Sequence, residues 1–152
     1  MACRPNVIQH MMDTEPQQRT TASVLVVDDH PVFVVGLTRL LFERGPYDVA
    51  SSGTAEQALA YVQQEKADVV LVDIALPDKS GLWLIQSIHN VKPELPCLVL
   101  SGYSIGLYVQ EAIRNGARGY VLKDDVPGIL EGIRAVLGGG TYFSEALRND
   151  GK

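Results

Sequence analysis

The chain has 152 residues, of which 46% are hydrophobic and 20% charged, and a formal net charge of −5. This size and composition fit one globular domain that buries its own core, and no stretch approaches the roughly 18 apolar residues of a membrane span. The acidic balance, without any cluster of Lys and Arg, argues against a nucleic-acid-binding surface on this chain.

The two cysteines are Cys3, in a polar stretch, and Cys97, in an apolar run. Without a CxxC motif or a Cys/His grouping, the sequence has no basis for a zinc site. Free thiols in a cytoplasmic protein are the expectation.

Residues 1–22 are polar and contain two prolines. They lack the uninterrupted apolar core of roughly 7 to 15 residues that a secretory signal requires. We expect this segment to be a disordered tail.

From Ser23 onward, short apolar runs alternate with helical periodicities. SVLVV (23–27) predicts a buried strand, YDVAS (47–51) a more polar edge strand, and DVVLV (68–72) a central parallel strand. The first helix between them begins with Pro31 in its first turn, and the second with Thr54 as its cap. Their predicted inward positions are Phe33, Leu37, Leu40 and Leu41 in the first helix, and Ala55, Ala58, Leu59 and Val62 in the second.

The second half continues the alternation. PCLVLS (96–101) and GYVLK (119–123) predict two more strands, Ser104 is a candidate helix cap, and Gly116 a helix stop. A GGG run (138–140) closes the last helix. The predicted inward positions of the three helices are Leu82, Ile85 and Ile88; Ile105, Val109, Ala112 and Ile113; and Val126, Ile129, Leu130, Ile133 and Val136. Five strands and five helices in strict alternation indicate a parallel α/β sheet covered by helices on both faces.

Trp83 falls nearly opposite the mean direction of Leu82, Ile85 and Ile88 at about 100° per residue. We expect it to face away from the sheet, as a contact for a partner protein. The alternative is that its ring lies partly flat on a neighbouring side chain.

Polar side chains follow the carboxyl ends of the predicted strands, where sites form in open α/β sheets. These residues are Asp28, Asp29, Asp73, Ser101 and Lys123. Three crowded carboxylates raise one another's pKa unless a cation neutralises them, and an all-oxygen ligand set favours Mg²⁺. Carboxylates, Mg²⁺, Lys and Ser together suit a phosphoryl group, with one Asp as a candidate nucleophile.

The motifs VVDDHP, LVDIALPDKSG, LVLSG and GARGYVLKD, in this order and spacing, resemble those of response-regulator receiver domains. The details DDHPVF, GL and KD are most similar to the NarL/LuxR branch. The resemblance covers residues 23 to about 139 and implies a doubly wound, five-stranded, flavodoxin-like sheet of strand order 2-1-3-4-5.

Site roles follow from the resemblance, position by position. Asp73 would be the phosphoacceptor and Lys123 the partner of the phosphoryl group. Asp28 and Asp29 would hold Mg²⁺, together with Asp73 and the backbone carbonyl of Ala75. Ser101 would move to the phosphoryl group, and Tyr120 would swing inward as Ser101 leaves. Ala75 and Tyr103 would set the lifetime of the acyl phosphate, with slow self-dephosphorylation expected because Ala75 offers no polar group and Tyr103 is bulky.

The implied function is that of a two-component receiver that catalyses only its own phosphorylation and dephosphorylation. Its implied partners are a sensor histidine kinase and, after phosphorylation, a second copy of the chain. Residues 23–139 would form the receiver, and residues 140–152 would begin a linker to a DNA-binding domain outside this chain, through which it would control transcription.

Two alternatives stay open. One is a stand-alone receiver that acts through protein contacts. The other is a Mg²⁺-dependent aspartyl phosphatase of the haloacid-dehalogenase type, which would require a D-x-D pattern after its first strand, where this chain has DDH.

Overall fold

The computed structural model describes residues 21–102 and 106–144. Of the tail expected at residues 1–22, residues 1–20 lie outside this part, and Ala22 begins β1. The strands are β1 (Ala22–Val27), β2 (Tyr47–Ser52), β3 (Val69–Asp73), β4 (Cys97–Ser101), β5 (Gly119–Leu122) and β6 (Tyr142–Phe143). The helices are α2 (Pro31–Arg44), α3 (Ala55–Gln64), α4 (Gly81–Val91), α5 (Gly106–Arg114) and α6 (Val126–Leu137).

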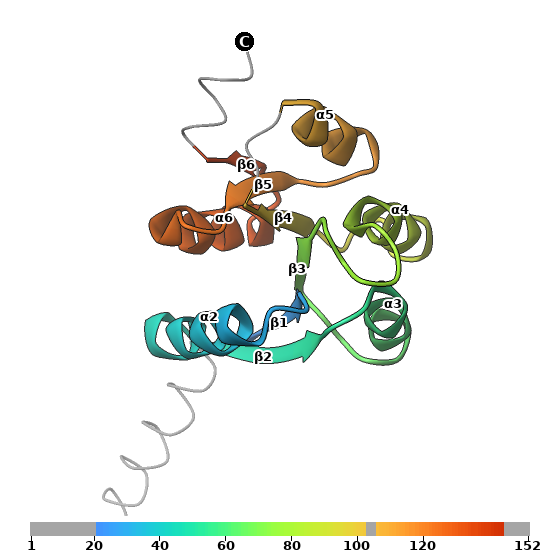
Figure 1. Ribbon diagram of the computed structural model, residues 1–152. Coiled ribbons are helices and arrows are strands. Elements are labelled where there is room, and N and C mark those ends of the chain that lie inside the picture. Colours follow the sequence, from blue (N-terminus) through green and yellow to red (C-terminus); the bar gives the residue numbers. More distant parts are fainter. Residues whose placement is uncertain (1–20, 103–105, 145–152) are drawn as a thin grey trace, which may run out of the picture.

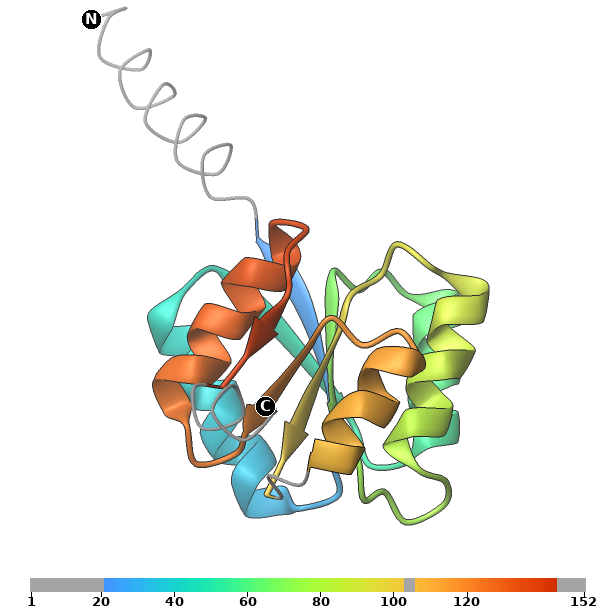
Figure 2. The same ribbon diagram turned by 90° about the horizontal axis from the view of Figure 1, so that it is seen from above.

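The strands form one parallel sheet in the order β2-β1-β3-β4-β5-β6. The first five follow the predicted order 2-1-3-4-5 of a flavodoxin-like fold. The sheet separates two layers of helices, with α2 and α6 on one face and α3, α4 and α5 on the other (Figures 1 and 2). The central strands β3 and β4 are buried along their whole length, as their continuous apolar runs predict.

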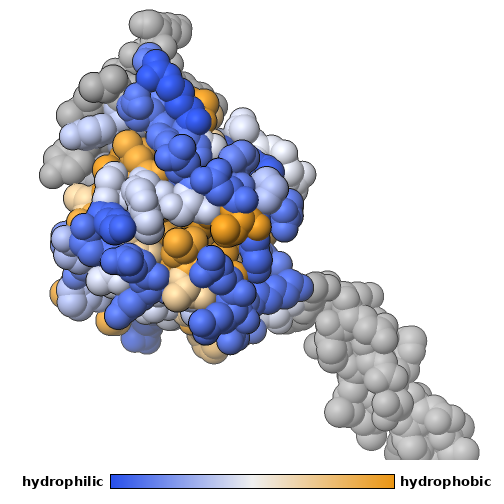
Figure 3. Space-filling view, turned by 90° about the vertical axis from the view of Figure 1, so that its right-hand side faces the viewer, coloured by the Kyte–Doolittle hydropathy of each residue, from blue (hydrophilic) through white to orange (hydrophobic). Residues whose placement is uncertain are grey.

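Two hydrophobic clusters, one on each face of the sheet, hold the layers together. The cluster under α2 and α6 contains Leu37, Leu41 and Ile133, while that under α3 and α4 contains Val62 and Ile85. The face carrying α3, α4 and α5 is largely hydrophilic outside, with smaller hydrophobic areas between the polar residues (Figure 3). No helix in the described part of the chain is both long and apolar enough to span a bilayer.

The sixth strand differs from the prediction of five. Tyr142 and Phe143, expected in a linker, pair with Gly119 and Tyr120 of β5. Ser144 then lies buried, accepting a hydrogen bond from the Leu122 N–H at 3.2 Å and donating one to the Asp125 carboxylate at 2.9 Å. The sheet therefore extends past residue 139. The backbone groups of residues 142–143 and the hydroxyl of Ser144 form hydrogen bonds with β5, which stabilise this extra strand.

In α4, Ile85 and Ile88 are buried and Leu82 is partly buried against the core cluster, as predicted, and Leu84 is buried as well. Two expected inward positions, one in α5 and one in α6, need correction. Ile113 in α5 is 48% exposed and Val126 at the start of α6 is 42% exposed. Terminal turns lie at the edge of the helix–sheet contact, where the apolar periodicity no longer decides burial. Ser104 and Ile105 lie outside the described residues.

Trp83 is partly buried and packs against the core cluster on its face of the sheet. The Lys79 ammonium lies 4.3 Å from the centre of its ring. The expectation of a side chain directed away from the protein is therefore wrong, and the alternative of a ring lying on its neighbours is the arrangement found.

Candidate functional site

Two buried aspartates lie side by side at the carboxyl edge of the sheet. Val27 of β1 pairs with Val72 of β3, so the next residues, Asp28 and Asp73, are neighbours. They are only 3% and 5% exposed. Asp29 is exposed beside them, and carboxylate oxygens of all three lie within 4.8 Å of one another and of a His30 nitrogen. The three acidic groups predicted to meet at one sheet edge do meet there.

Lys123, the residue after β5, places its ammonium between the two buried carboxylates. Its Nζ is 2.6 Å from Oδ2 of Asp28 and 3.3 Å from Oδ2 of Asp73. The ammonium also lies 4.7 Å from the centre of the Phe33 ring, in the range of a cation–π contact. The predicted lysine is therefore in place, and part of its charge is shielded from water by α2.

His30 belongs to this site although its side chain had no predicted role. Its Nδ1 is 2.6 Å from Oδ1 of Asp28 and 3.5 Å from a carboxylate oxygen of both Asp29 and Asp73. The imidazole thus lies among all three carboxylates. The only signal in the sequence was its place directly after the two aspartates in VVDDHP.

The two buried carboxyls have opposite pKa shifts. Burial alone raises the pKa of Asp28, but hydrogen bonds from Lys123 and His30 outweigh it, so the pKa of Asp28 lies below its ordinary value. Burial, reinforced by the charge of Asp28, raises the pKa of Asp73 despite the opposing effect of Lys123. The negative charge of Asp73 is therefore less fully compensated by neighbouring groups than that of Asp28.

The donor set fits a hard divalent cation. Carboxylate oxygens are the ligands that Mg²⁺ prefers. Among the described residues, Oδ2 of Asp28 is buried without a hydrogen bond of ordinary geometry, although the Lys123 ammonium is 2.6 Å away. A cation that binds Asp28 would therefore compete with the Lys123 ammonium for this oxygen.

Ser101 and Tyr120 lie next to each other behind the carboxylates. Ser101 ends β4 and is buried, and its carbonyl accepts the backbone N–H of Lys123 at 2.9 Å. Tyr120 is fully buried; burial raises the pKa of its hydroxyl, and a hydrogen bond with Ser101 lowers it in part. The tyrosine expected to swing inward is thus already inside in this structure.

Ala75 donates its backbone N–H to Oδ1 of Asp73 at 3.2 Å, which places it beside the site. The role of its carbonyl as a metal ligand stays a prediction. Tyr103 lies outside the described residues, so its expected position over the site stays a prediction as well.

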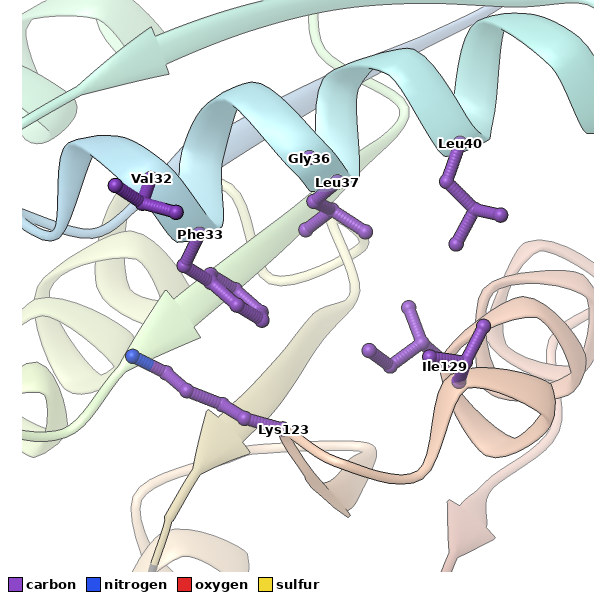
Figure 4. Close-up of a pocket in the computed structure, with 8 residues that line it drawn as sticks. Val32, Phe33, Gly36, Leu37, Leu40, Lys123 and Ile129 are labelled. Atoms are coloured by element: carbon purple, nitrogen blue, oxygen red, sulfur yellow. The ribbon is translucent and has the colours of Figure 1, made fainter.

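An apolar groove between α2 and α6 opens beside the carboxylates. Figure 4 shows Phe33, Leu37 and Leu40 of α2 facing Ile129 of α6, with the Lys123 side chain at one end. Phe33 and Lys123 also line the depression that contains Asp73, so groove and site are continuous. Val32, which also lines the groove, and Val35 and Phe42 of α2 are strongly exposed. Exposed apolar residues on this scale are typical of a protein-binding surface.

Comparison with known proteins identifies the family of this chain. Residues 24–135 match the family model of the response regulator receiver domain. The chain is 35% identical over 132 residues to the transcriptional regulatory protein MctR of Rhizobium johnstonii, covering 86% of this chain and 62% of that protein. It therefore spans about three fifths of the length of this relative.

Two solved structures share the fold. A two-component response regulator of the LuxR family from an Aurantimonas species superimposes with a TM-score of 0.83 at 27% identity, over 87% of this chain and 96% of that one. A response regulator from Burkholderia pseudomallei, solved with a phosphorylated aspartic acid, a calcium ion and citrate, superimposes with a TM-score of 0.69 at 33% identity, over 78% and 69%. With its matched motifs, fold and strand-end carboxylates, this chain belongs to the response-regulator receiver domain family and is similar to its LuxR/NarL branch.

Proposed function

We propose that this chain is the phosphoacceptor receiver of a two-component response regulator and takes a phosphoryl group onto Asp73. The observation that carries the proposal is the burial of the Asp73 carboxylate at the end of β3, next to Asp28 and 3.3 Å from the Lys123 ammonium. A carboxylate oxygen of Asp73 attacks the phosphorus, a P–O bond forms, and the bond from phosphorus to the donor nitrogen breaks.

The charge of the incoming group must be neutralised at the same time. Asp28, Asp29, Asp73 and the Ala75 carbonyl would hold Mg²⁺, which when bound offsets the charge of the carboxylates and of the phosphoryl oxygens. Lys123 is already within reach of Asp73 and pairs with the new phosphoryl oxygens.

The conformational change that follows phosphorylation would involve Ser101 and Tyr120. Ser101 leaves its hydrogen bond with Tyr120 to bind the phosphoryl group. Because Tyr120 is already inside, we propose that the change it undergoes is the loss of this partner and a repacking within the core. Ala75 and Tyr103 would slow hydrolysis of the acyl phosphate.

The proposed donor is a sensor histidine kinase in the cytoplasm. Its docking surface is the apolar groove between α2 and α6, which is continuous with the site. The proposed output is transcription through a DNA-binding domain outside this chain, with dimer formation on phosphorylation, since relatives such as MctR are named transcriptional regulatory proteins. A stand-alone receiver that acts through protein contacts is the second candidate.

The test is to incubate the protein with a small phosphodonor such as acetyl phosphate and Mg²⁺, and then to measure its intact mass. We expect a stable gain of one phosphoryl group that is absent in Asp73→Asn and in excess chelator. An adduct that persists in Asp73→Asn would overturn the assignment. Release of phosphate without a lasting adduct would instead support an aspartyl phosphatase.

A further inference from the structure

The loop between β3 and α4, residues 74–80, carries Ala75 and packs against the core cluster through Ile74 and Leu76. Ala75, Pro77, Asp78, Lys79 and Ser80 are all exposed. At its two ends, the Ala75 N–H binds the Asp73 carboxylate at 3.2 Å and the Gly81 N–H binds the Ile74 carbonyl at 2.8 Å. The segment after Leu76, residues 77–80, is exposed and requires another attachment if it is to keep a defined position.

Asp78 supplies that attachment by binding the N-terminus of α3. Its Oδ1 accepts the backbone N–H of Ala55 at 2.9 Å, and its Oδ2 accepts that of Glu56 at 3.0 Å. The pKa of Asp78 is lowered, first by the hydrogen bond from Ala55. Both carboxylate oxygens are thus engaged by a helix more than twenty residues away in sequence.

The helix already has a cap of its own. Thr54 accepts the N–H of Gln57 at 3.2 Å, and this is the normal N-cap arrangement. Because α3 keeps its local cap without Asp78, the main effect of this contact is on the loop. Among the described hydrogen bonds, it is the one that ties the exposed segment after Leu76 to α3.

We propose that Asp78 is a positioning residue for the metal site, which holds the β3–α4 loop on α3 so that the Ala75 backbone presents its carbonyl to the cation. The inference rests on the proposed function. Some residues orient a metal ligand without touching the metal themselves. Replacing such a residue changes metal affinity by about 10- to 100-fold. The loop, and with it Ala75, becomes mobile once the carboxylate is lost.

The test compares Asp78→Ala and Asp78→Asn with two controls. Thr54→Ala weakens the same helix end without touching the loop, and Glu56→Gln removes an exposed negative charge next to it. For each protein, the Mg²⁺ dependence of acetyl-phosphate labelling is measured well below the unfolding temperature, together with Mg²⁺ affinity by calorimetry.

We expect the Asp78 variants to require about 10-fold more Mg²⁺, with a limiting labelling rate at saturating Mg²⁺ within about twofold of wild type. Both controls should keep the wild-type Mg²⁺ dependence. If Asp78→Ala and Asp78→Asn lose stability as Thr54→Ala does but bind Mg²⁺ like wild type, Asp78 is only a helix cap and the inference fails. If wild type itself neither binds Mg²⁺ nor becomes labelled, the proposed function fails first.

Discussion

The Lys123 ammonium lies 2.6 Å from Oδ2 of Asp28, a buried carboxylate assigned to metal binding. The same ammonium is farther, at 3.3 Å, from Asp73, which is assigned to accept the phosphoryl group. Without a divalent cation, Lys123 therefore compensates the carboxylate that would hold the cation. Binding of Mg²⁺ at Asp28 would leave the ammonium available to Asp73 and its phosphoryl group.

Lys123→Met should therefore destabilise the metal-free protein by about 1–3 kcal/mol, because two buried carboxylates lose their shared partner. Urea unfolding in chelator measures this loss, and saturating Mg²⁺ should restore most of it. Lys66→Met is the matched control, since the Lys66 ammonium is 4.0 Å from Asp68 on a side chain that is 84% exposed, and its loss should change little. Equal effects of the two substitutions would contradict this account.

Replacing His30 should strengthen Mg²⁺ binding. The Nδ1 of His30 lies among the three carboxylates and must move before a cation can bind them. The hydrogen bond to Asp28 that is then broken is worth about 0.5–1.5 kcal/mol, so His30→Ala should bind Mg²⁺ about two- to tenfold more tightly. Calorimetry measures the difference, with His89→Ala at an exposed position of α4 as control. Weaker binding would instead mean that His30 contributes a ligand.

Gly81→Ala should disturb the site through its backbone. An added Cβ would lie 2.8 Å from Cα of Ile74 and also too close to the carbonyl oxygen of Asp73. We expect a loss of about 1–3 kcal/mol in the free energy of unfolding, and slower labelling by acetyl phosphate because the Asp73 backbone has to shift. Gly36→Ala in α2, where nothing lies within 4 Å, should gain about 0.4–1 kcal/mol. Labelling of Gly81→Ala at the wild-type rate would exclude this contact as a constraint on the site.

The Cys97 thiol should be protected from alkylation in the folded protein. Its burial should also make the free energy of unfolding fall at high pH. Burial raises the pKa of its thiol from 9.0 to about 12. Because the folded protein holds this proton more tightly than the unfolded chain, its contribution is complete below pH 9.0 and is lost as the pH rises toward 12, by about 1.4 kcal/mol per unit.

The measurement is urea unfolding in a Cys3→Ser background, with and without Cys97→Val. The difference in stability between the two proteins should shift above pH 9.0 in favour of the valine variant. At neutral pH the Cys97 thiol should react with an alkylating reagent only after unfolding, since the residue is 2% exposed. Rapid alkylation of the folded protein would show that the thiol is accessible.

The sequence alone was sufficient to predict that four residues meet at one edge of the sheet, namely Asp28, Asp73, Ser101 and Lys123. Each follows an apolar strand, and the carboxyl ends of parallel strands meet at the same edge whatever the details of packing. The cap of α3 at Thr54 is equally local, because a helix N-terminus uses side chains within its first turn. The order of the first five strands follows from the same alternation once the family resemblance is added.

The tertiary structure decided what depends on distant contacts. Asp78 reaches the N-terminus of α3 across 23 residues, and Ser144 is buried against Asp125, neither of which has a periodic signal. The side-chain conformations of His30, Trp83 and Tyr120 are likewise set by their neighbours in space, because several rotamers are open to each and only the assembled packing and charges select one. Strand ends are therefore predictable from the order of residues, whereas the contacts that hold the loop and tune the carboxylates exist only in the folded protein.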